Sequence, residues 1–127
     1  MNRVHNRVLP LIPVKNQGRI IESHHSGLVE IIQPRNGFID RLVRLVRSTP
    51  EVMRIQLDDR GSFVWQAIDG NRNVEEIGRL LDAEFGKEAA PLYERLTLFL
   101  LILKNNGFIE IYHSSNEVIK HQAAHKH

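Results

Sequence analysis

The chain has 127 residues, the size of one ordinary domain with little room for a second. Its composition, 42% hydrophobic and 25% charged, excludes a disordered tail protein, a collagen-like chain and a disulfide-stapled miniprotein. The chain contains no cysteine, which excludes disulfides, cysteine-bound zinc or iron–sulfur clusters and thiol catalysis. The first residues lack the apolar stretch of a secretory signal, and no apolar run is long enough to span a membrane. We therefore expect a cytoplasmic protein.

The formal net charge of +2 conceals an uneven distribution along the chain. Residues 1–50 carry eight Lys and Arg against three Asp and Glu, whereas residues 51–112 carry seven against eleven. The last fifteen residues carry two against one. We therefore expect the partner-binding surface and the core to lie in different parts of the chain.

The first elements in chain order are an arm and a hairpin. Residues 1–18 contain two prolines and are expected to form an extended arm ahead of the domain. Two β-branched runs follow, residues 19–23 and residues 28–33. They are separated by a loop that contains Gly27, and this pattern predicts a β-hairpin.

The next segment, residues 34–50, predicts an inserted helix. Within it, the apolar residues of the stretch 38–47 recur with a helical period, and three arginines share the other side. These arginines are Arg41, Arg44 and Arg47. Pro50 ends the segment, because the residue before a proline disfavours the helical conformation. We expect the basic face of this helix to contact a partner.

A third strand is predicted over residues 52–57, where apolar and polar residues alternate. Alternation places one set on the first face, namely Met53, Ile55 and Leu57. The other face carries Val52, Arg54 and Gln56. At a sheet edge, the unpaired N–H and C=O groups of such a strand would be a template for an extended peptide.

Three helices and a short strand are predicted after the third strand. Asp58 or Asp59 can cap the first helix, because either carboxylate can accept hydrogen bonds from its free N–H groups. Asn73 and Glu76 resemble a capping box that opens the second helix. The predicted ranges are residues 58–68, 74–85 and 88–106 for the helices, 108–112 for the strand and 113–127 for a polar, flexible tail.

These elements predict an α+β fold, a winged-helix-like domain over residues 19–112 in which three N-terminal strands are followed by three helices. The amphipathic helix of the insert lies between the second and third strands. The arm and the tail are expected outside this domain.

The third predicted helix is apolar on more than one side. Its core face consists of Leu92, Leu96, Phe99, Leu100 and Leu103. Leu98 and Leu101 point away from that face, and Ile102 lies on its border. An ordinary surface helix is polar on its outer side, so the outward leucines imply either a covering layer or a groove for a partner. The covering layer would be the arm or the basic helix.

No group of residues has the spacing of a catalytic or metal site. The sequence contains no phosphate-binding loop, no dinucleotide fingerprint, no zinc-protease motif and no serine-hydrolase motif. The adjacent His24 and His25 lie in the predicted hairpin loop and are expected to be solvated. The same holds for the histidines of the tail, His113, His121, His125 and His127. We expect a protein that is not an enzyme and that holds no cofactor and no metal.

Two other interpretations of the same elements stay open. A winged-helix transcription regulator would use the third helix to read DNA. That helix has no net charge, however, and its outer side carries leucine where base and phosphate contacts need polar or basic residues, so nucleic acid is disfavoured. The other interpretation is a structural domain whose groove is filled by its own arm, residues 1–18.

Several segments of the second half resemble the PqqD family. They are residues 57–65 (LDDRGSFVW), residues 68–77 (IDGNRNVEEI), Leu81, residues 85–86 and residues 103–109 (LKNNGFI). The resemblance is close from Leu57 to Ile111 and looser from Arg19 to Leu57.

The resemblance implies the winged-helix-like arrangement known as the RiPP recognition element, and a non-catalytic role. Domains of this kind hold the leader segment of a ribosomally made precursor peptide and present it to a modifying enzyme, often a radical S-adenosylmethionine enzyme. In the founding pathway the product is the cofactor pyrroloquinoline quinone (PQQ). The resemblance places the leader against residues 52–57 as an added strand, and against the outer side of the last helix with Leu98 and Leu101.

The insert at residues 34–50 departs from the family pattern, in which a short turn joins the second and third strands. Three roles are open for it. It could cover part of the groove, recruit a different partner, or mediate self-association into a homodimer.

Overall fold

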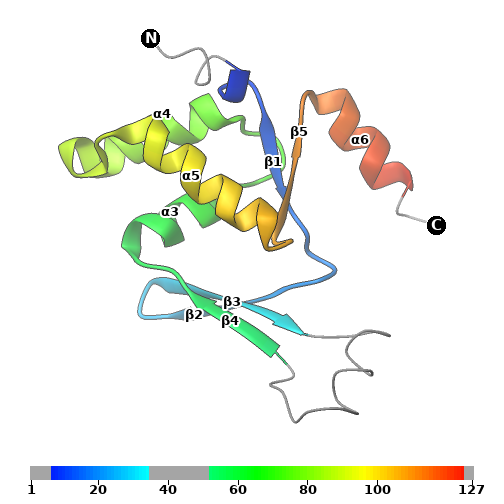
Figure 1. Cartoon of the computed structure of the whole chain (residues 1–127), viewed down its shortest axis with the longest axis horizontal. Coiled ribbons are helices and arrows are strands. Elements are labelled where there is room, and N and C mark those ends of the chain that lie inside the picture. Colours follow the sequence, from blue (N-terminus) through cyan, green and yellow to red (C-terminus); the bar gives the residue numbers. More distant parts are fainter. Residues whose placement is uncertain (1–6, 35–51, 125–127) are drawn as a thin grey trace.

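A computed structural model describes residues 7–34 and 52–124, and it is an α+β structure (Figure 1). The strands are β1 (Ile12–Lys15), β2 (Ile21–His25), β3 (Leu28–Pro34), β4 (Val52–Gln56) and β5 (Ile109–Tyr112). The helices are α3 (Asp59–Ala67), α4 (Val74–Phe85), the 3-10 helix η1 (Gly86–Ala89), α5 (Leu92–Asn105) and α6 (Ser115–Ala124). The α+β class is confirmed. The predicted order is wrong, because four strands precede α3, and β5 is followed by a further helix.

Three strands form one antiparallel sheet in the order β2-β3-β4. The predicted hairpin is present, but its turn is shorter than expected, because His25 pairs with Leu28. Ser26 and Gly27 have φ values of 54° and 81°, and such left-handed values suit a two-residue hairpin turn. His24 and His25 therefore belong to β2 and not to a loop.

The strands β3 and β4 pair with Ile31 opposite Ile55, and both side chains face the helices. On the other face, Glu30 accepts hydrogen bonds from Arg54 Nη1 and from Gln56 Nε2, each at 3.2 Å. The alternation predicted for the third strand is thus observed over residues 54–57. The basic helix predicted between β3 and β4, with Arg41, Arg44 and Arg47, lies outside the described residues.

A second, two-stranded sheet pairs β1 with β5, with Ile12 opposite Tyr112. The structure differs here from the arm expected over residues 1–18. The first part of this segment is attached to the start of α4, because two of its carbonyl groups accept hydrogen bonds from N–H groups that the helix leaves unpaired. Val74 N–H donates to Leu11 C=O at 2.9 Å, and Glu75 N–H donates to Leu9 C=O at 3.0 Å.

The predicted helix caps are confirmed. Asp58 Oδ1 accepts a hydrogen bond from Gly61 N–H at 2.7 Å and begins α3. At the start of α4, Asn73 Oδ1 accepts from Glu76 N–H at 2.9 Å, and Glu76 Oε1 accepts from Asn73 N–H at 3.1 Å. Each cap satisfies donors that the helix itself leaves unpaired.

Two helix predictions need correction. The helix expected from residue 88 begins only at Leu92, because η1 and Pro91 interrupt it and a residue before proline avoids the helical conformation. The tail expected to be flexible contains α6, whose Val118 is buried. Ser114 Oγ accepts a hydrogen bond from Glu117 N–H at 3.3 Å at the start of α6. Ser114 and Glu117 have the spacing of a capping box, which is the signal that sequence reasoning overlooked.

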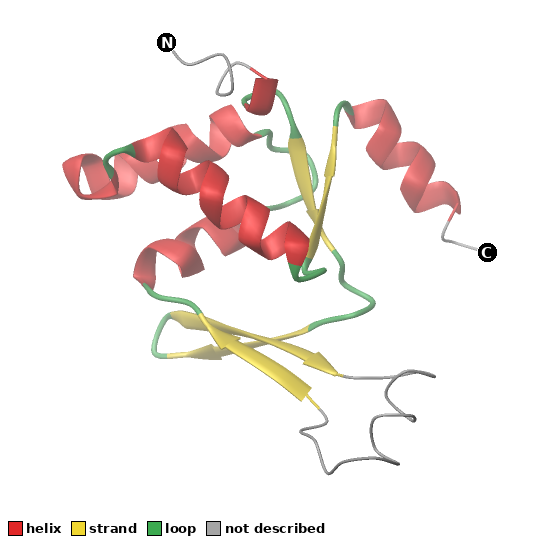
Figure 2. Cartoon of the chain, in the orientation of Figure 1, coloured by secondary structure: helices red, strands yellow, loops and turns green. Residues whose placement is uncertain are grey.

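The core lies between the three-stranded sheet and the helices. Figure 2 shows this sheet on one side of α3, with α4 and α5 on the other side of that helix, and the β1–β5 pair beside α5. The largest fully buried side chains include Trp65, Phe108, Ile31 and Ile77. In the described part of the chain, no helix has both the length and the apolar character that crossing a bilayer requires.

Candidate functional site

The strand β4 lies at the end of the strand order, so among the described residues only its β3 side is paired. Leu57 N–H donates to Val29 C=O at 2.9 Å, and this bond shows which residues of the strand direct their backbone groups towards β3. Because antiparallel ladders alternate, Ile55 also directs its backbone groups to β3, whereas Arg54 and Gln56 direct theirs outward. Among the described residues, the outer edge thus presents unpaired backbone donors and acceptors, as a pairing template does.

The helix α5 keeps exposed apolar side chains, as the sequence indicates. Leu98, Leu101 and Ile102 are 59%, 46% and 47% exposed, whereas the core side of the helix is buried. The segment 7–18 does not cover them. The interpretation that the arm fills this surface is therefore wrong for the described part of the arm.

Not all three exposed residues share one side of α5. At about 100° per residue, Ile102 follows the same flank as Arg95 and Phe99, and this flank faces the first turn of α3. Leu98 lies on the outermost side, and Leu101 lies on the opposite flank. By this periodicity, Ile102 and Leu98 lie closer to the flank of α5 that faces α3 than Leu101 does.

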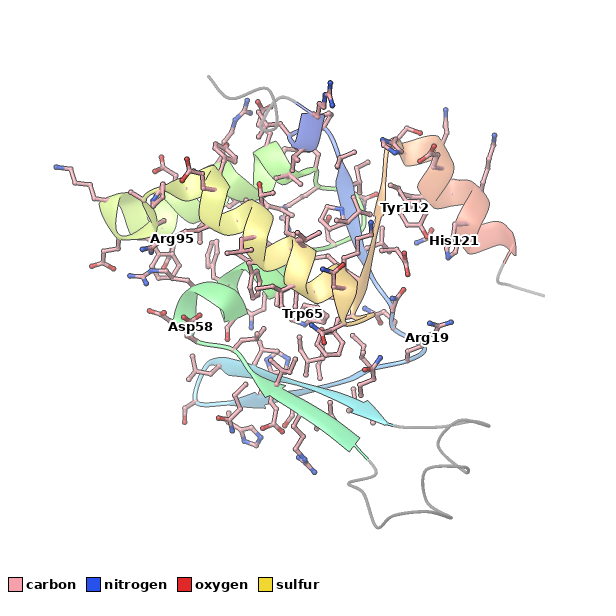
Figure 3. All side chains as sticks on the ribbon, viewed as in Figure 1. Arg19, Asp58, Trp65, Arg95, Tyr112 and His121 are labelled. Carbon is pink, nitrogen blue, oxygen red and sulfur yellow. The ribbon has the colours of Figure 1, made fainter. Side chains whose placement is uncertain are left out.

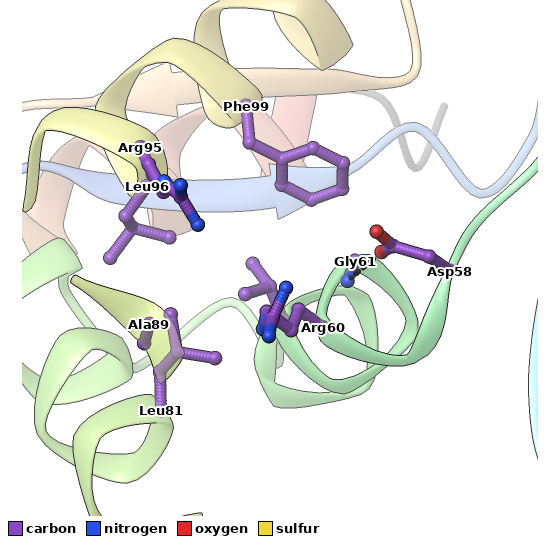
Figure 4. A pocket seen from close by; sticks show the side chains of 9 residues that line it. Asp58, Arg60, Gly61, Leu81, Ala89, Arg95, Leu96 and Phe99 are labelled. Atoms are coloured by element: carbon purple, nitrogen blue, oxygen red, sulfur yellow. Dashed lines mark hydrogen bonds between the residues drawn. The ribbon is translucent and has the colours of Figure 1, made fainter. Parts of the chain in front are cut away.

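A pocket of about 180 Å³ opens between α3 and α5 (Figure 4). Its lining is Asp58, Arg60, Gly61, Val64, Leu81, Ala89, Arg95, Leu96 and Phe99. Gly61 lets the two helices approach, because a Cβ there would lie 3.0 Å from Asp58 Oδ1 and 3.3 Å from Phe99 Cζ. Figure 3 places Asp58 where β4 passes into α3, so the pocket continues from the end of the open strand.

Sequence reasoning missed the polar part of this pocket. Arg60 and Arg95 come from different helices, and nothing in their local spacing predicts that they meet. Helical periodicity predicts Phe99 on the core face, whereas the structure places it at the border, half-buried against Gly61. The short Asp-Asp-Arg-Gly-Ser run was the available signal, since a glycine in the first turn of a helix suits a close approach.

Buried Ser62 fixes the junction between β4 and α3. Its Oγ accepts a hydrogen bond from Val29 N–H at 2.8 Å and donates to Leu57 C=O at 3.3 Å. The hydroxyl thus continues the β3–β4 ladder for one more step beyond the last paired residues. This contact holds the end of the open strand against the helix that carries the pocket.

A charged cluster joins the two sheets on the far side of α3. Glu22 accepts hydrogen bonds from the indole N–H of buried Trp65 and from Lys15 Nζ, the latter at 2.9 Å, and His24 Nε2 lies 3.7 Å away. Burial raises the pKa of Glu22, but the hydrogen bonds from Lys15 and Trp65 outweigh it, and the net pKa is lowered. The Lys15 ammonium also lies 4.7 Å from the Trp65 ring centroid. These contacts are structural and lie outside the pocket.

Other predicted site residues can be placed only in part. The side chains of Val52 and Met53 lie outside the described part of the structure, as do Arg41, Arg44 and Arg47. His24 and His25 are exposed on β2. Within residues 7–34 and 52–124, no group of three or more histidine and acidic side chains could hold a metal ion.

Comparison with known proteins bears on the segment that builds this site. The family model described as coenzyme PQQ synthesis protein D (PqqD) matches residues 46–109. No curated protein and no solved structure gave a significant match. The matched range is half of the chain and includes β4, the pocket, all of α5 and the start of β5. The chain belongs to the PqqD family.

Proposed function

We propose that this chain is a non-catalytic adaptor that binds the leader segment of a ribosomally synthesised precursor peptide and presents it to a modifying enzyme, as in PQQ biosynthesis. The observation that carries the proposal is the open outer edge of β4, which leads to a pocket flanked by exposed apolar residues of α5. The match to PqqD over this segment supports it. In this proposal, β2–β4 and α3–α5 form the winged-helix-like recognition element.

The peptide adds to β4 as a further strand. Its backbone pairs with the outward groups of Arg54 and Gln56, which gives affinity without regard to sequence. Alternate side chains of the peptide then contact α5, where Leu98 and Ile102 supply apolar surface. Leu101, on the opposite flank, contributes least. Val52 and Met53 extend the edge along which the peptide lies.

The modifying enzyme supplies the chemistry. A radical S-adenosylmethionine enzyme is the partner that the family suggests, and the absence of cysteine here means that its cysteine-bound cluster belongs to that partner. We propose the basic face with Arg41, Arg44 and Arg47 as a partner surface, which leaves the strand edge to the peptide.

The proposal is tested with the full chain and fluorescently labelled precursor peptides encoded beside its gene. We expect a dissociation constant of tens of micromolar or tighter by anisotropy, which corresponds to about −6 kcal/mol. Leu98→Asp and Ile102→Asp should each weaken binding at least tenfold. The matched control is Ile119→Asp, on exposed α6, which should bind as the wild type does. Absence of binding, or equal binding by all variants, would refute the groove.

A further inference from the structure

Two arginines converge on the pocket between α3 and α5. Arg60 comes from the first turn of α3, and Arg95 from the first turn of α5. Figure 4 shows both guanidinium groups pointing into the space between the helices, with Asp58 at its other end. Like charges repel, so this arrangement favours an anion between them.

Arg60 is held in place without its hydrogen bonds being satisfied. Its guanidinium carbon lies 5.8 Å from the Phe85 ring centroid, and Phe85 packs edge-on against Phe63. The Arg60 Nε atom is buried and has no hydrogen-bond partner among the described residues. A buried donor without a partner is costly and rare in native proteins, so the Arg60 guanidinium keeps unused hydrogen-bonding capacity.

Neither nearby carboxylate, Glu88 or Asp58, accepts a hydrogen bond from the Arg60 guanidinium. Glu88 forms an ion pair with Arg60, but its Oε2 lies 3.7 Å from Arg60 Nη2, beyond hydrogen-bond distance, and the Glu88 side chain is 71% exposed. Asp58 uses its Oδ1 to cap α3. Arg95 forms no ion pair with any carboxylate in the described part of the chain.

Apart from the Asp58 carboxylate, the rest of the pocket lining is apolar. The guanidinium groups share the pocket with the apolar residues Val64, Leu81, Ala89, Leu96 and Phe99. Such a lining suits a group with a short hydrocarbon stem and a terminal anion. A guanidinium has donors and no acceptor, so a carboxylate fits it and a primary amide fits less well.

We propose that this pocket is a specificity subsite that takes an acidic side chain, Asp or Glu, of the bound peptide. The inference rests on the proposed function, because the pocket follows directly on the open end of β4. The carboxylate pairs with the guanidinium groups of Arg60 and Arg95. Peptides that carry a neutral residue at that position bind more weakly.

The pocket can be tested without the natural peptide. The probe is N-acetylglutamate α-amide, titrated into the ¹⁵N-labelled full chain while the arginine Nε–Hε resonances are observed. We expect the Arg60 and Arg95 signals to shift with a dissociation constant of about 1–10 mM, and N-acetylglutamine α-amide to leave them unmoved. Arg95→Gln should abolish the shift of Arg60, and Glu88→Gln should tighten binding two- to threefold. The control is Arg79→Gln, which removes an exposed arginine paired with Glu75 on α4.

Two outcomes of this titration overturn the subsite. One is that neither arginine signal moves with the glutamate probe. The other is that N-acetylalanine, whose only anion is its terminal carboxylate, binds more tightly than the glutamate probe. That result would assign the pocket to a chain terminus instead of an acidic side chain.

A displayed pool of random peptides separates this inference from the adaptor role. Selection on the wild type should enrich Asp or Glu at one position, and selection on Arg95→Glu should shift that position towards Lys or Arg. Binders without any acidic preference overturn the subsite and leave the adaptor role standing. If no peptide in the pool binds, the adaptor role is overturned. The carboxylate in the pocket could then not come from a bound peptide.

Discussion

The ring of Tyr93 on α5 packs directly against the Cα atom of Gly78 on α4, where a Cβ would lie 2.3 Å from Tyr93 Cε1. Tyr93 Oη also donates a hydrogen bond to Glu75 C=O at 3.3 Å. Burial raises the pKa of Tyr93, so the hydroxyl stays protonated as a donor. This contact sets the distance between the two helices, and thereby the position of the α5 flank that lines the pocket.

Gly78→Ala should destabilise the fold by about 1–3 kcal/mol, because the ring of Tyr93 is rigid and must move to admit a methyl group. The free energy of unfolding in urea measures the effect. Gly18→Ala is the control, since nothing lies within 4 Å of a Cβ at that position. In a Tyr93→Ala background the Gly78→Ala cost should largely vanish, and a cost that persists there would contradict the packing argument.

Ser62→Ala should cost about 1–3 kcal/mol of stability, because it leaves the buried Val29 N–H without its acceptor. Chemical denaturation measures the loss, with the exposed Ser115→Ala as control. Amide hydrogen exchange at Val29 should accelerate in Ser62→Ala more than at Ile31, which keeps its pairing with β4. Equal acceleration at both positions would show that the hydroxyl has no local role.

Stability should depend on pH through Glu22. Its pKa in the folded state is lower than the ordinary value of 4.5, so its stabilising contribution is fully present above that value and is lost as the pH falls through the lowered pKa. The difference in Tm between wild type and Glu22→Gln should therefore be largest near neutral pH and shrink in acid. If the difference in Tm instead grew on acidification, the pKa of Glu22 would be raised in the folded state. That result would exclude the Lys15 and Trp65 contacts as the cause of the pH dependence.

Arg54→Pro should abolish peptide binding by strand addition, because proline removes a backbone N–H that points away from β3. The matched control is Arg54→Ala, which loses the same ion pair with Glu30 but keeps the N–H group. We expect at least a tenfold difference in dissociation constant between the two variants by anisotropy. Circular dichroism verifies that both are folded. Equal affinities would mean that the peptide does not pair with β4.

The parts of the fold that sequence predicts well are those with local causes. Asp58 and Asn73 cap helices through bonds to residues three positions away, so the pattern itself contains the answer. The pairing of Ile12 with Tyr112 joins the two ends of the chain, and no local pattern reports it. Ser114 shows an intermediate case, because its capping signal is local but lies in a polar segment that resembles a frayed end.

The candidate site also contains features that the local sequence predicts and features that only the packed fold produces. Alternation along β4 predicts which side chains face outward, and helical periodicity predicts the exposure of Leu98. The meeting of Arg60 with Arg95 depends on how α3 and α5 approach each other, and that distance is set by Gly61 and its contact with Phe99. A close approach of two helices is a property of the packed fold, and no single segment carries it.

The N–H groups at the start of α4 donate hydrogen bonds to Leu9 and Leu11, which lie outside the range matched by the family model. The part of the chain that folds together is therefore longer than the part that identifies the family. A fragment trimmed to residues 46–109 would lack both carbonyl groups, and it would also lack β3. Both edges of β4 would then be unpaired, so such a fragment could capture a peptide, or a second copy of itself, on the side that β3 normally occupies. Affinities measured on the trimmed fragment would therefore describe a surface that the whole protein does not possess.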